Sequence, residues 1–182
     1  MSEKHLEFPN EFQNQVVTMV LELIAADLGR FLLFSPLQNL SQGVYSNKNK
    51  SDMEIEYDKE HWHKDPMHPT RYEDTNVRVV SDSMLMTLSE WKQRHLYINF
   101  LKPHGYVHDV DTYFRQDGKI VGVLTLLRSD ENRPFTAAEV KLLENLQPFM
   151  EYTLSKVFLP QRITERNQLQ QKYQLTCREL DV

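Results

Sequence analysis

Alternating apolar and polar positions are most regular in the middle of the chain. Two runs rich in β-forming residues, 106–115 and 119–128, flank Asp117 and Gly118. An Asp-Gly pair favours the positive φ angles of a tight hairpin turn. The pattern therefore predicts a β-hairpin centred on these two residues.

The expected register of this hairpin places two carboxylates on a face that is otherwise apolar. Counting outward from the turn sets Asp109 beside Leu126 and Asp111 beside Leu124. Buried carboxylates need partners, and a one-residue slip of register would move both to the other face. We expect Arg128, diagonal to Asp109 in this register, to pair with one of them. Without such a partner, two like charges would form an acid pair of raised pKa.

Helical spacing of apolar residues appears towards both ends of the chain. Pro9 suits the first position of a helix, and Gly29 suits its end. The apolar arc between them is wide enough for two stripes, which predicts that a second surface such as another subunit covers one stripe; the alternative is one deeply buried helix. Thr136 and Glu139 have capping-box spacing and predict the start of a second long helix. The expected dimerisation residues on these two helices are Val17, Leu21, Ile24, Leu28, Met150, Leu154 and Val157.

Shorter elements are predicted between the two long helices. Residues 30–35, 40–45 and 77–80 match strand patterns, and Ser51 with Glu54 predicts a helix that runs towards residue 62. Together with the hairpin, the pattern predicts an α/β (α+β) domain with four to six short strands.

Composition excludes several classes of protein. The chain has 182 residues, of which 40% are hydrophobic and 26% charged, as expected for one globular domain with an appendage. A net charge of −5 argues against binding nucleic acid by general electrostatics. The lone Cys177 excludes a disulfide framework, and no apolar run is long enough to span a membrane. We therefore expect a cytoplasmic protein with no membrane partner.

The last residues predict a helix that starts where the chain stops. Thr176 and Glu179 again have capping-box spacing, but too few residues follow for a stable helix. This pattern predicts a polypeptide cut from something longer; the alternative is a frayed natural C-terminus. We expect one globular domain over residues 1–160, which the resemblance given next identifies as a sensory and dimerisation domain, and, over 161–182, a helical connector followed by the truncated start of another domain.

The tail resembles the opening of the helix-turn-helix domain of LuxR-type bacterial transcription regulators, which commonly starts Leu-Thr-x-Arg-Glu. The residues before it resemble the GAF-like sensory domain of such regulators, so that the resemblance covers roughly residues 55–182. The matching segments are Trp62 with Asp65 and Pro66, residues 97–105, residues 122–128, residues 134–136 and residues 142–148.

This resemblance implies a GAF/PAS-like fold with a central antiparallel sheet of about five strands and helices on both faces. It also implies a homodimer, a small-molecule pocket between the sheet and the covering loops, and DNA contact only through a C-terminal domain absent from this chain. Aromatic walls with a few polar groups are typical of small-molecule sites, although each aromatic is also explained as plain core. The expected pocket residues are Tyr57, Trp62, Asp65, Tyr72, Trp91, Tyr97, His108 and Asp109.

Two alternatives to a general small-molecule sensor stay open. A related set of LuxR-type receptors binds acyl-homoserine lactones, in which a Trp or Tyr followed by an Asp-Pro pair bonds to the ligand. Tyr57, Trp62 and Asp65 resemble that arrangement with a closer spacing, so lactone sensing is the first alternative. The second is a ligand-free dimerisation module with a filled core.

Metal binding and catalysis are not expected. His61, His63 and His68 lie near Glu60 and Asp65, but their spacing is unlike that of a structural zinc site. The sequence contains no Gly-rich phosphate loop and no Gly-x-Ser-x-Gly motif. We therefore predict no cofactor, no metal and no enzyme activity.

Overall fold

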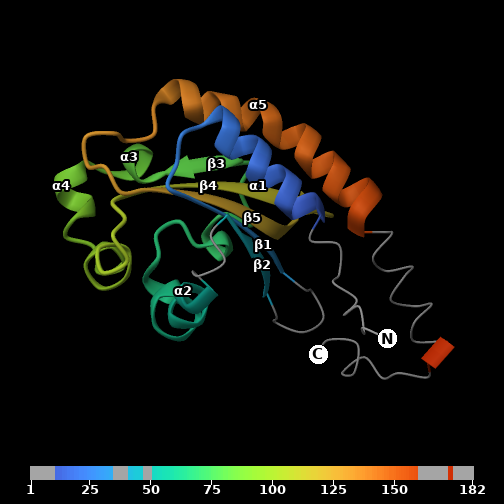
Figure 1. Ribbon diagram of the computed structural model, residues 1–182, viewed down its shortest axis with the longest axis horizontal. Helices are drawn as coiled ribbons and strands as arrows, with labels where there is room; N and C mark the ends of the chain where they lie inside the picture. The colour runs from blue at the N-terminus through green and yellow to red at the C-terminus, as the bar shows by residue number, and fades with distance from the viewer. Residues whose placement is uncertain (1–10, 35–40, 47–50, 160–171, 174–182) are drawn as a thin grey trace, which may run out of the picture.

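A five-stranded antiparallel sheet forms the centre of the protein (Figure 1). The computed structural model describes residues 11–34, 41–46, 51–159 and 172–173. The strands lie in the order β2-β1-β5-β4-β3, and every neighbouring pair is antiparallel. This architecture confirms the predicted α+β fold class. The strands are β1 (Leu28–Phe34), β2 (Ser41–Tyr45), β3 (Val79–Ser81), β4 (His108–Gln116) and β5 (Lys119–Arg128).

Two long helices cover one face of the sheet. Helix α1 spans Glu11–Leu23, and α5 spans Ala137–Thr153 before it continues as the π-helical turn η6 (Leu154–Phe158). Both lie above the sheet in Figure 1, and apolar side chains from both join one core with alternate residues of β1, β4 and β5. We call this the helix-side core. The predicted capping box is confirmed, since Thr136 and Glu139 each bond to the other's backbone N–H.

Short helical segments cover the opposite face. Apolar side chains from these segments pack against the sheet in a second core, which we call the pocket-side core. Figure 1 shows α2 below the sheet, on the side away from α1 and α5. The segments that contribute to this core are α2 (Ser51–Glu56), η2 (Tyr57–His61), α4 (Leu88–Trp91) and η5 (Tyr97–Leu101). Three further short helices are η3 (Trp62–Lys64), η4 (Pro69–Arg71) and α3 (Asp82–Leu85), none of whose residues belongs to it.

The first helix is shorter than the sequence pattern indicates. It ends at Leu23, and β1 begins at Leu28, so that Gly29 lies in a strand and does not end a helix. A Cβ atom added at Gly29 would lie 3.0 Å from Cγ1 of Val17. Gly29 therefore lets β1 approach α1 closely, which explains a glycine at this position in place of the predicted helix end.

Most of the predicted dimerisation residues are buried inside the chain. Val17, Ile24, Met150 and Leu154 belong to the helix-side core, and Leu28 belongs to the pocket-side core. Their prediction as surface contacts is wrong because both apolar stripes of α1 are covered within the same chain. Val17 and Leu21 pack on β1, where a Cβ atom added at Gly29 would lie 3.0 and 3.1 Å from their side chains, and the ring of Phe12 on the other stripe lies 4.6 Å from that of Phe158 in η6. Leu21 is half-buried against the same core, and Val157 is 48% exposed.

The hairpin forms with the predicted turn, but its register shifts by one residue. Asp117 and Gly118 have φ angles of 52° and 81°, as the turn requires. Arg115 pairs with Ile120 and Phe114 with Gly122, so that Val121 is an extra residue in a β-bulge.

Because of this bulge the expected neighbours of the two aspartates are wrong. Asp109 pairs with Leu127, and Asp111 pairs with Thr125. Both carboxylates share the pocket side of the sheet with these partners, while Leu124 and Leu126 face the helix-side core.

The ends of the chain lie largely beyond what the structure describes. Of the predicted connector only residues 172–173 are included, and the tail 175–182 is outside the described residues. The division at residue 160 therefore stays a prediction. Within the described part of the chain, no helix is long and apolar enough to cross a membrane.

Candidate ligand-binding site

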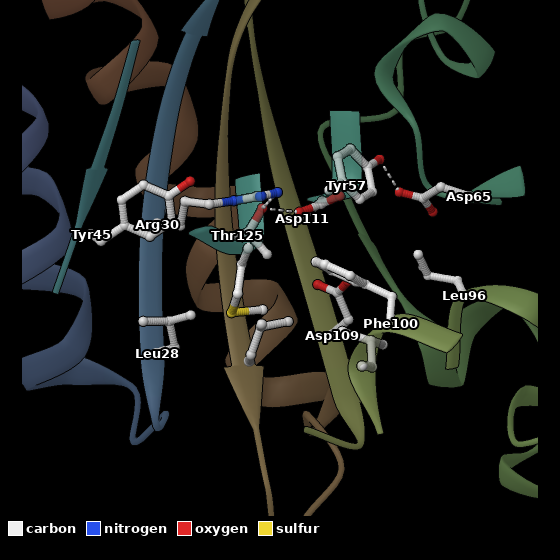
Figure 2. Close-up of a pocket in the computed structure, with 13 residues that line it drawn as sticks. Leu28, Arg30, Tyr45, Tyr57, Asp65, Leu96, Phe100, Asp109, Asp111 and Thr125 are labelled. Carbon is white, nitrogen blue, oxygen red and sulfur yellow. Dashed lines mark hydrogen bonds between the residues drawn. The ribbon is translucent and has the colours of Figure 1, made fainter. Parts of the chain in front are cut away.

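A small pocket with a charged floor lies between the sheet and the short helical segments (Figure 2). Its floor includes Arg30 of β1, Asp109 and Asp111 of β4 and Thr125 of β5. Leu96 and Phe100, from the segment around η5, lie opposite. Side chains alternate between the two faces of a strand, so these polar residues face the pocket while their neighbours in the sequence face the helix-side core.

Tyr57 and Asp65 form a hydrogen-bonded pair at one end of the pocket. The Tyr57 hydroxyl donates to Oδ2 of Asp65 at 2.6 Å, and Oδ1 accepts the backbone N–H of Met67 at 2.7 Å. Burial raises the pKa of Asp65, although both hydrogen bonds act in the opposite direction. The Asp65 carboxylate is therefore well supplied with donors.

Arg30 approaches Asp111 through a hydroxyl. Thr125 donates to Oδ1 of Asp111 at 2.6 Å, and the guanidinium of Arg30 reaches the same Thr125 oxygen at 3.4 Å. That second contact is long for a charged donor. Nε of Arg30 is buried and has no acceptor among the described residues. Burial and the charge of Asp65 raise the pKa of Asp111, while the Thr125 bond lowers it.

Asp109 is the least satisfied acid in the pocket. It is 6% exposed, and its Oδ1 atom has no hydrogen-bond partner in the described part of the chain. Burial, and then the charges of Asp111 and Asp65, raise its pKa well above the usual value. The prediction that Arg128 pairs with one of these aspartates is wrong, because Arg128 is engaged elsewhere.

Arg128 lies at the far end of β5 in a separate polar cluster. Its guanidinium donates to Glu139 at 2.6 Å and to the carbonyl oxygens of Ala25 and Pro134 at 2.7 and 3.0 Å. It also stacks on the ring of Phe135, 4.1 Å from the ring centre. Burial raises the pKa of Glu139, but its hydrogen bonds, that from Arg128 first among them, outweigh burial and lower it overall.

His108 lies beside this cluster and does not line the pocket. Its Nδ1 atom is 2.7 Å from Oδ2 of Asp82, and its Nε2 atom is 3.1 Å from the carbonyl oxygen of Glu131. Burial lowers the pKa of His108, but these two bonds outweigh it, and the pKa is raised overall. The position of His108 is explained by this buried pair.

The predicted aromatic candidates are distributed over several places. Tyr57 lines the pocket with Asp65 and Asp109, whereas Trp62, Tyr72, Trp91 and Tyr97 do not. Trp62 is 43% exposed, and Trp91 is buried with its indole N–H on the carbonyl oxygen of Val107. Tyr72 stacks on Tyr113, and Tyr97 is buried in the pocket-side core. The sequence interpretation missed Arg30, Asp111 and Thr125 as pocket residues; a charged residue within an apolar strand was the available signal for Arg30.

The histidines near the pocket contact different partners. His61 lies between Glu56 and His95, with contacts of 3.4 and 3.3 Å, and His68 bonds to Thr70. In the described ranges no group of three or more His, Cys, Asp or Glu residues could hold a metal ion.

The free space inside the pocket is small. It amounts to about 20 Å³, which is room for about one water molecule. Small-molecule sites commonly measure about 300–1,000 Å³. A larger ligand would therefore have to displace the segments that cover the pocket.

Comparison with known proteins supports the fold. No family model matches the sequence, and no curated protein sequence matches it either. Solved structures do match. The ligand-binding domain of VqsR from Pseudomonas aeruginosa has a TM-score of 0.61 at 15% identity, over 86% of this chain and 88% of that one.

Two further solved structures resemble the chain to a similar degree. The GAF3 domain of Slr1393 from Synechocystis gives a TM-score of 0.58 at 14% identity, over 86% and 99% of the two chains. The N-acylhomoserine-lactone-dependent LuxR-family factor CepR2 from Burkholderia cenocepacia gives 0.55 at 16%, over 84% and 85%. At these identities the likeness shows a shared GAF-like fold.

Proposed function

We propose that this chain is the signal-sensing domain of a LuxR-type transcription regulator and that it binds a small molecule in the pocket described above. The single observation that carries the proposal is the buried Oδ1 of Asp109 on the pocket floor, which has no hydrogen-bond partner among the described residues. A carboxylate held in this way costs free energy unless something else supplies a donor. The GAF-like fold shared with VqsR and CepR2 supports the same proposal. We infer a role in binding rather than in catalysis.

Lactone sensing is the second candidate. The Tyr57–Asp65 hydrogen bond favours it, because an aromatic residue and the Asp of an Asp-Pro pair lie together at the pocket, as in the arrangement noted in the sequence. Two observations weigh against it: Trp62 is 43% exposed, and the free space is about 20 Å³. That small volume favours the third candidate, a dimerisation module with a filled core. The pocket's unsatisfied polar atoms favour a ligand.

A continuous series of hydrogen bonds connects the pocket with α5. The Tyr113 hydroxyl donates to the carbonyl oxygen of Met67, whose N–H is held by Asp65. On the other face of the sheet, Gln147 of α5 donates to the carbonyl oxygen of Tyr113 at 2.8 Å. We propose that a ligand which moves Asp65 biases α5 through these contacts, and that α5 passes the change to the C-terminal DNA-binding domain.

The proposed dimer would use the outward surface of α5 and η6. Phe149 is 71% exposed, Tyr152 is 64% exposed and Val157 is 48% exposed. These residues replace the buried members of the predicted set. Light scattering tests this part: a dimer that becomes a monomer in Phe149→Asp supports it, and a wild-type chain that is monomeric at all concentrations overturns it.

The binding proposal is tested by thermal unfolding of the chain with a panel of small molecules. The panel contains N-butanoyl-homoserine lactone, neutral metabolites, amines and carboxylates. A ligand that binds only the folded chain raises the melting temperature by several degrees when it is well above its Kd.

Two variants show whether such a ligand uses the pocket. Leu127 lines the pocket, whereas the adjacent Leu126 faces the helix-side core. Leu127→Phe and Leu126→Phe both overpack a core, but only the first fills the pocket. A shift retained in Leu126→Phe and lost in Leu127→Phe supports the site. Equal loss or equal retention in both variants, or no shift with any compound, overturns the proposed function.

A further inference from the structure

The pocket holds an excess of buried acid. Asp65, Asp109 and Asp111 are each at most 6% exposed, and one guanidinium, that of Arg30, faces all three. Fully ionised, these four groups would carry a net charge of −2. Burial raises the pKa of each of the three acids, which is the expected response of carboxyl groups that lack sufficient positive charge.

Two of the three acids have partners that explain their burial. Asp65 accepts from the Tyr57 hydroxyl and from a backbone N–H, and Asp111 accepts from the Thr125 hydroxyl. Asp109 differs, because its Oδ1 is buried and unpartnered among the described residues. Figure 2 shows its carboxylate inside the pocket beside Phe100. Something outside the described chain is needed to complete this group.

We propose that the pocket recognises the ammonium group of a small amine, which Asp109 binds directly. The inference rests on the proposed ligand-binding function and names the chemistry of its ligand. An ammonium group offers three donors, and Oδ1 of Asp109 accepts from no donor among the described residues. Its size also fits, since the free space of about 20 Å³ takes a group about as large as a water molecule. The ring of Phe100 lines the same space and attracts cations through its face.

The charges around Asp109 favour a cation over an anion. Asp111 on the same strand, Asp65 from the covering loop and Asp82 from α3 all oppose ionisation of Asp109, and only Arg30 favours it. A bound ammonium would supply the missing positive charge. The Nε–H of Arg30, which has no acceptor among the described residues, would donate to an acceptor group on the same ligand, so a simple amine and an amino acid are both possible sources of the ammonium group.

Calorimetric titration of the 182-residue chain tests the inference. The probes are butylammonium chloride, the isosteric neutral 1-butanol and the zwitterion γ-aminobutyrate, at matched ionic strength. We expect butylammonium to bind at least about tenfold more tightly than 1-butanol. Tighter binding of γ-aminobutyrate than of butylammonium would identify an amino acid as the source, and the reverse order a simple amine.

Paired variants locate the binding group. Asp109→Asn keeps the shape of the side chain and removes its charge, and we expect it to weaken butylammonium at least about tenfold. Asp74→Asn makes the same change at an exposed position and should leave affinity unchanged. Wild-type chain provides a readout that needs no variant: in a series of pH values above about 4, binding should release protons wherever Asp109 is partly protonated in the empty pocket, because the bound ammonium group favours the ionised carboxyl.

Three results overturn the inference. They are equal affinity for butylammonium and 1-butanol, unchanged affinity in Asp109→Asn, and binding without proton release at any pH in the series. If the amines do not bind but a neutral compound shows the loss specific to Leu127→Phe, the ammonium inference fails and the proposed function stands. If no compound binds at all, both fail.

Discussion

Arg128 and Arg30 both point into the interior of this protein, but their surroundings are very different. Arg128 reaches Glu139 and two loop carbonyls with bonds of 2.6 to 3.0 Å, and its side chain is 4% exposed. Arg30 has a long hydrogen bond of 3.4 Å to Thr125, lies 5.6 Å from the centre of the Tyr57 ring, and has a buried Nε with no acceptor among the described residues. A buried ion is stable only when its hydrogen bonds are satisfied. We therefore expect the cluster around Arg128 to stabilise the fold and the group around Arg30 to be completed by the proposed ligand.

The buried acids near each arginine repeat this difference. Asp82 keeps one unpartnered oxygen, but the other lies 2.7 Å from a ring nitrogen of His108. Ionisation of Asp109 is opposed by three acids, Asp111, Asp65 and Asp82, and one of its oxygens has no partner among the described residues. Burial alone does not distinguish a structural acid from a binding acid; the supply of donors does.

The largest expected effect is the loss of Arg128. Arg128→Met leaves Glu139 and the loop carbonyls without their donor and should lower the free energy of unfolding by about 3–5 kcal/mol. Arg30→Met loses one long hydrogen bond, and its acids can take up protons, so we expect a loss below about 2 kcal/mol. Urea denaturation measures both. Equal losses would remove the distinction between the two clusters.

Opposite signs are expected when the two buried aspartates are neutralised. At about pH 8, Asp109→Asn should raise the free energy of unfolding by about 1–2 kcal/mol, because a raised pKa is a cost paid by the folded state. Asp82→Asn should lower it by about 1–3 kcal/mol, since the buried hydrogen bond with His108 is disrupted. The same denaturation experiment decides, and a loss of stability in both variants would contradict this account.

The pH dependence of stability carries the same information with a defined sign. The pKa of Asp109 is raised in the folded chain, so its contribution is complete below the unfolded value of about 3.9 and is lost as pH rises through the folded value. The free energy of unfolding of the wild type, minus that of Asp109→Asn, should therefore decrease as pH rises above about 4. Denaturation at a series of pH values measures this difference. A difference that stays constant with pH, or increases with it, would show that the pKa of Asp109 is not raised in the folded chain.

The smallest effect separates a pocket aromatic from an exposed one. Tyr57→Phe removes the donor to Asp65 and should cost about 0.5–1.5 kcal/mol. Trp62→Ala removes a side chain that is 43% exposed and should change stability by no more than about 0.5 kcal/mol. Thermal unfolding of the two variants is sufficient. A larger loss of stability in Trp62→Ala than in Tyr57→Phe would contradict the conclusion that Trp62 lies outside the pocket.

Much of the fold was predictable because its signals are local. The Asp117–Gly118 turn and the Thr136–Glu139 capping box each depend on a few adjacent residues, and both are confirmed. The register of the hairpin was not predictable, because counting outward from the turn assumes regular pairing, whereas β4 and β5 pair with a bulge at Val121. The slip changed the predicted neighbours of the two aspartates, although their place on the pocket face depends on strand alternation.

The site was predictable only in part for a related reason. Tyr57, Asp65 and Asp109 were identified from residue type and resemblance, but Trp91 and Tyr97 were grouped with them although they serve the core. Arg30 was missed because its role depends on strands that meet only in the folded sheet. Likewise, the wide apolar arc of α1 did not reveal that β1 and η6 of the same chain cover it.

The pKa of Asp109 tests the central claim most directly. Carbon-detected NMR of a chain labelled at the aspartate carboxyls follows its titration with and without butylammonium chloride. The account predicts a pKa well above the usual value in the free chain, lowered when the probe is bound, while the probe leaves the Asp74 carboxyl signal unmoved. An ordinary pKa in the free chain, or a raised one that the probe does not change, would contradict it.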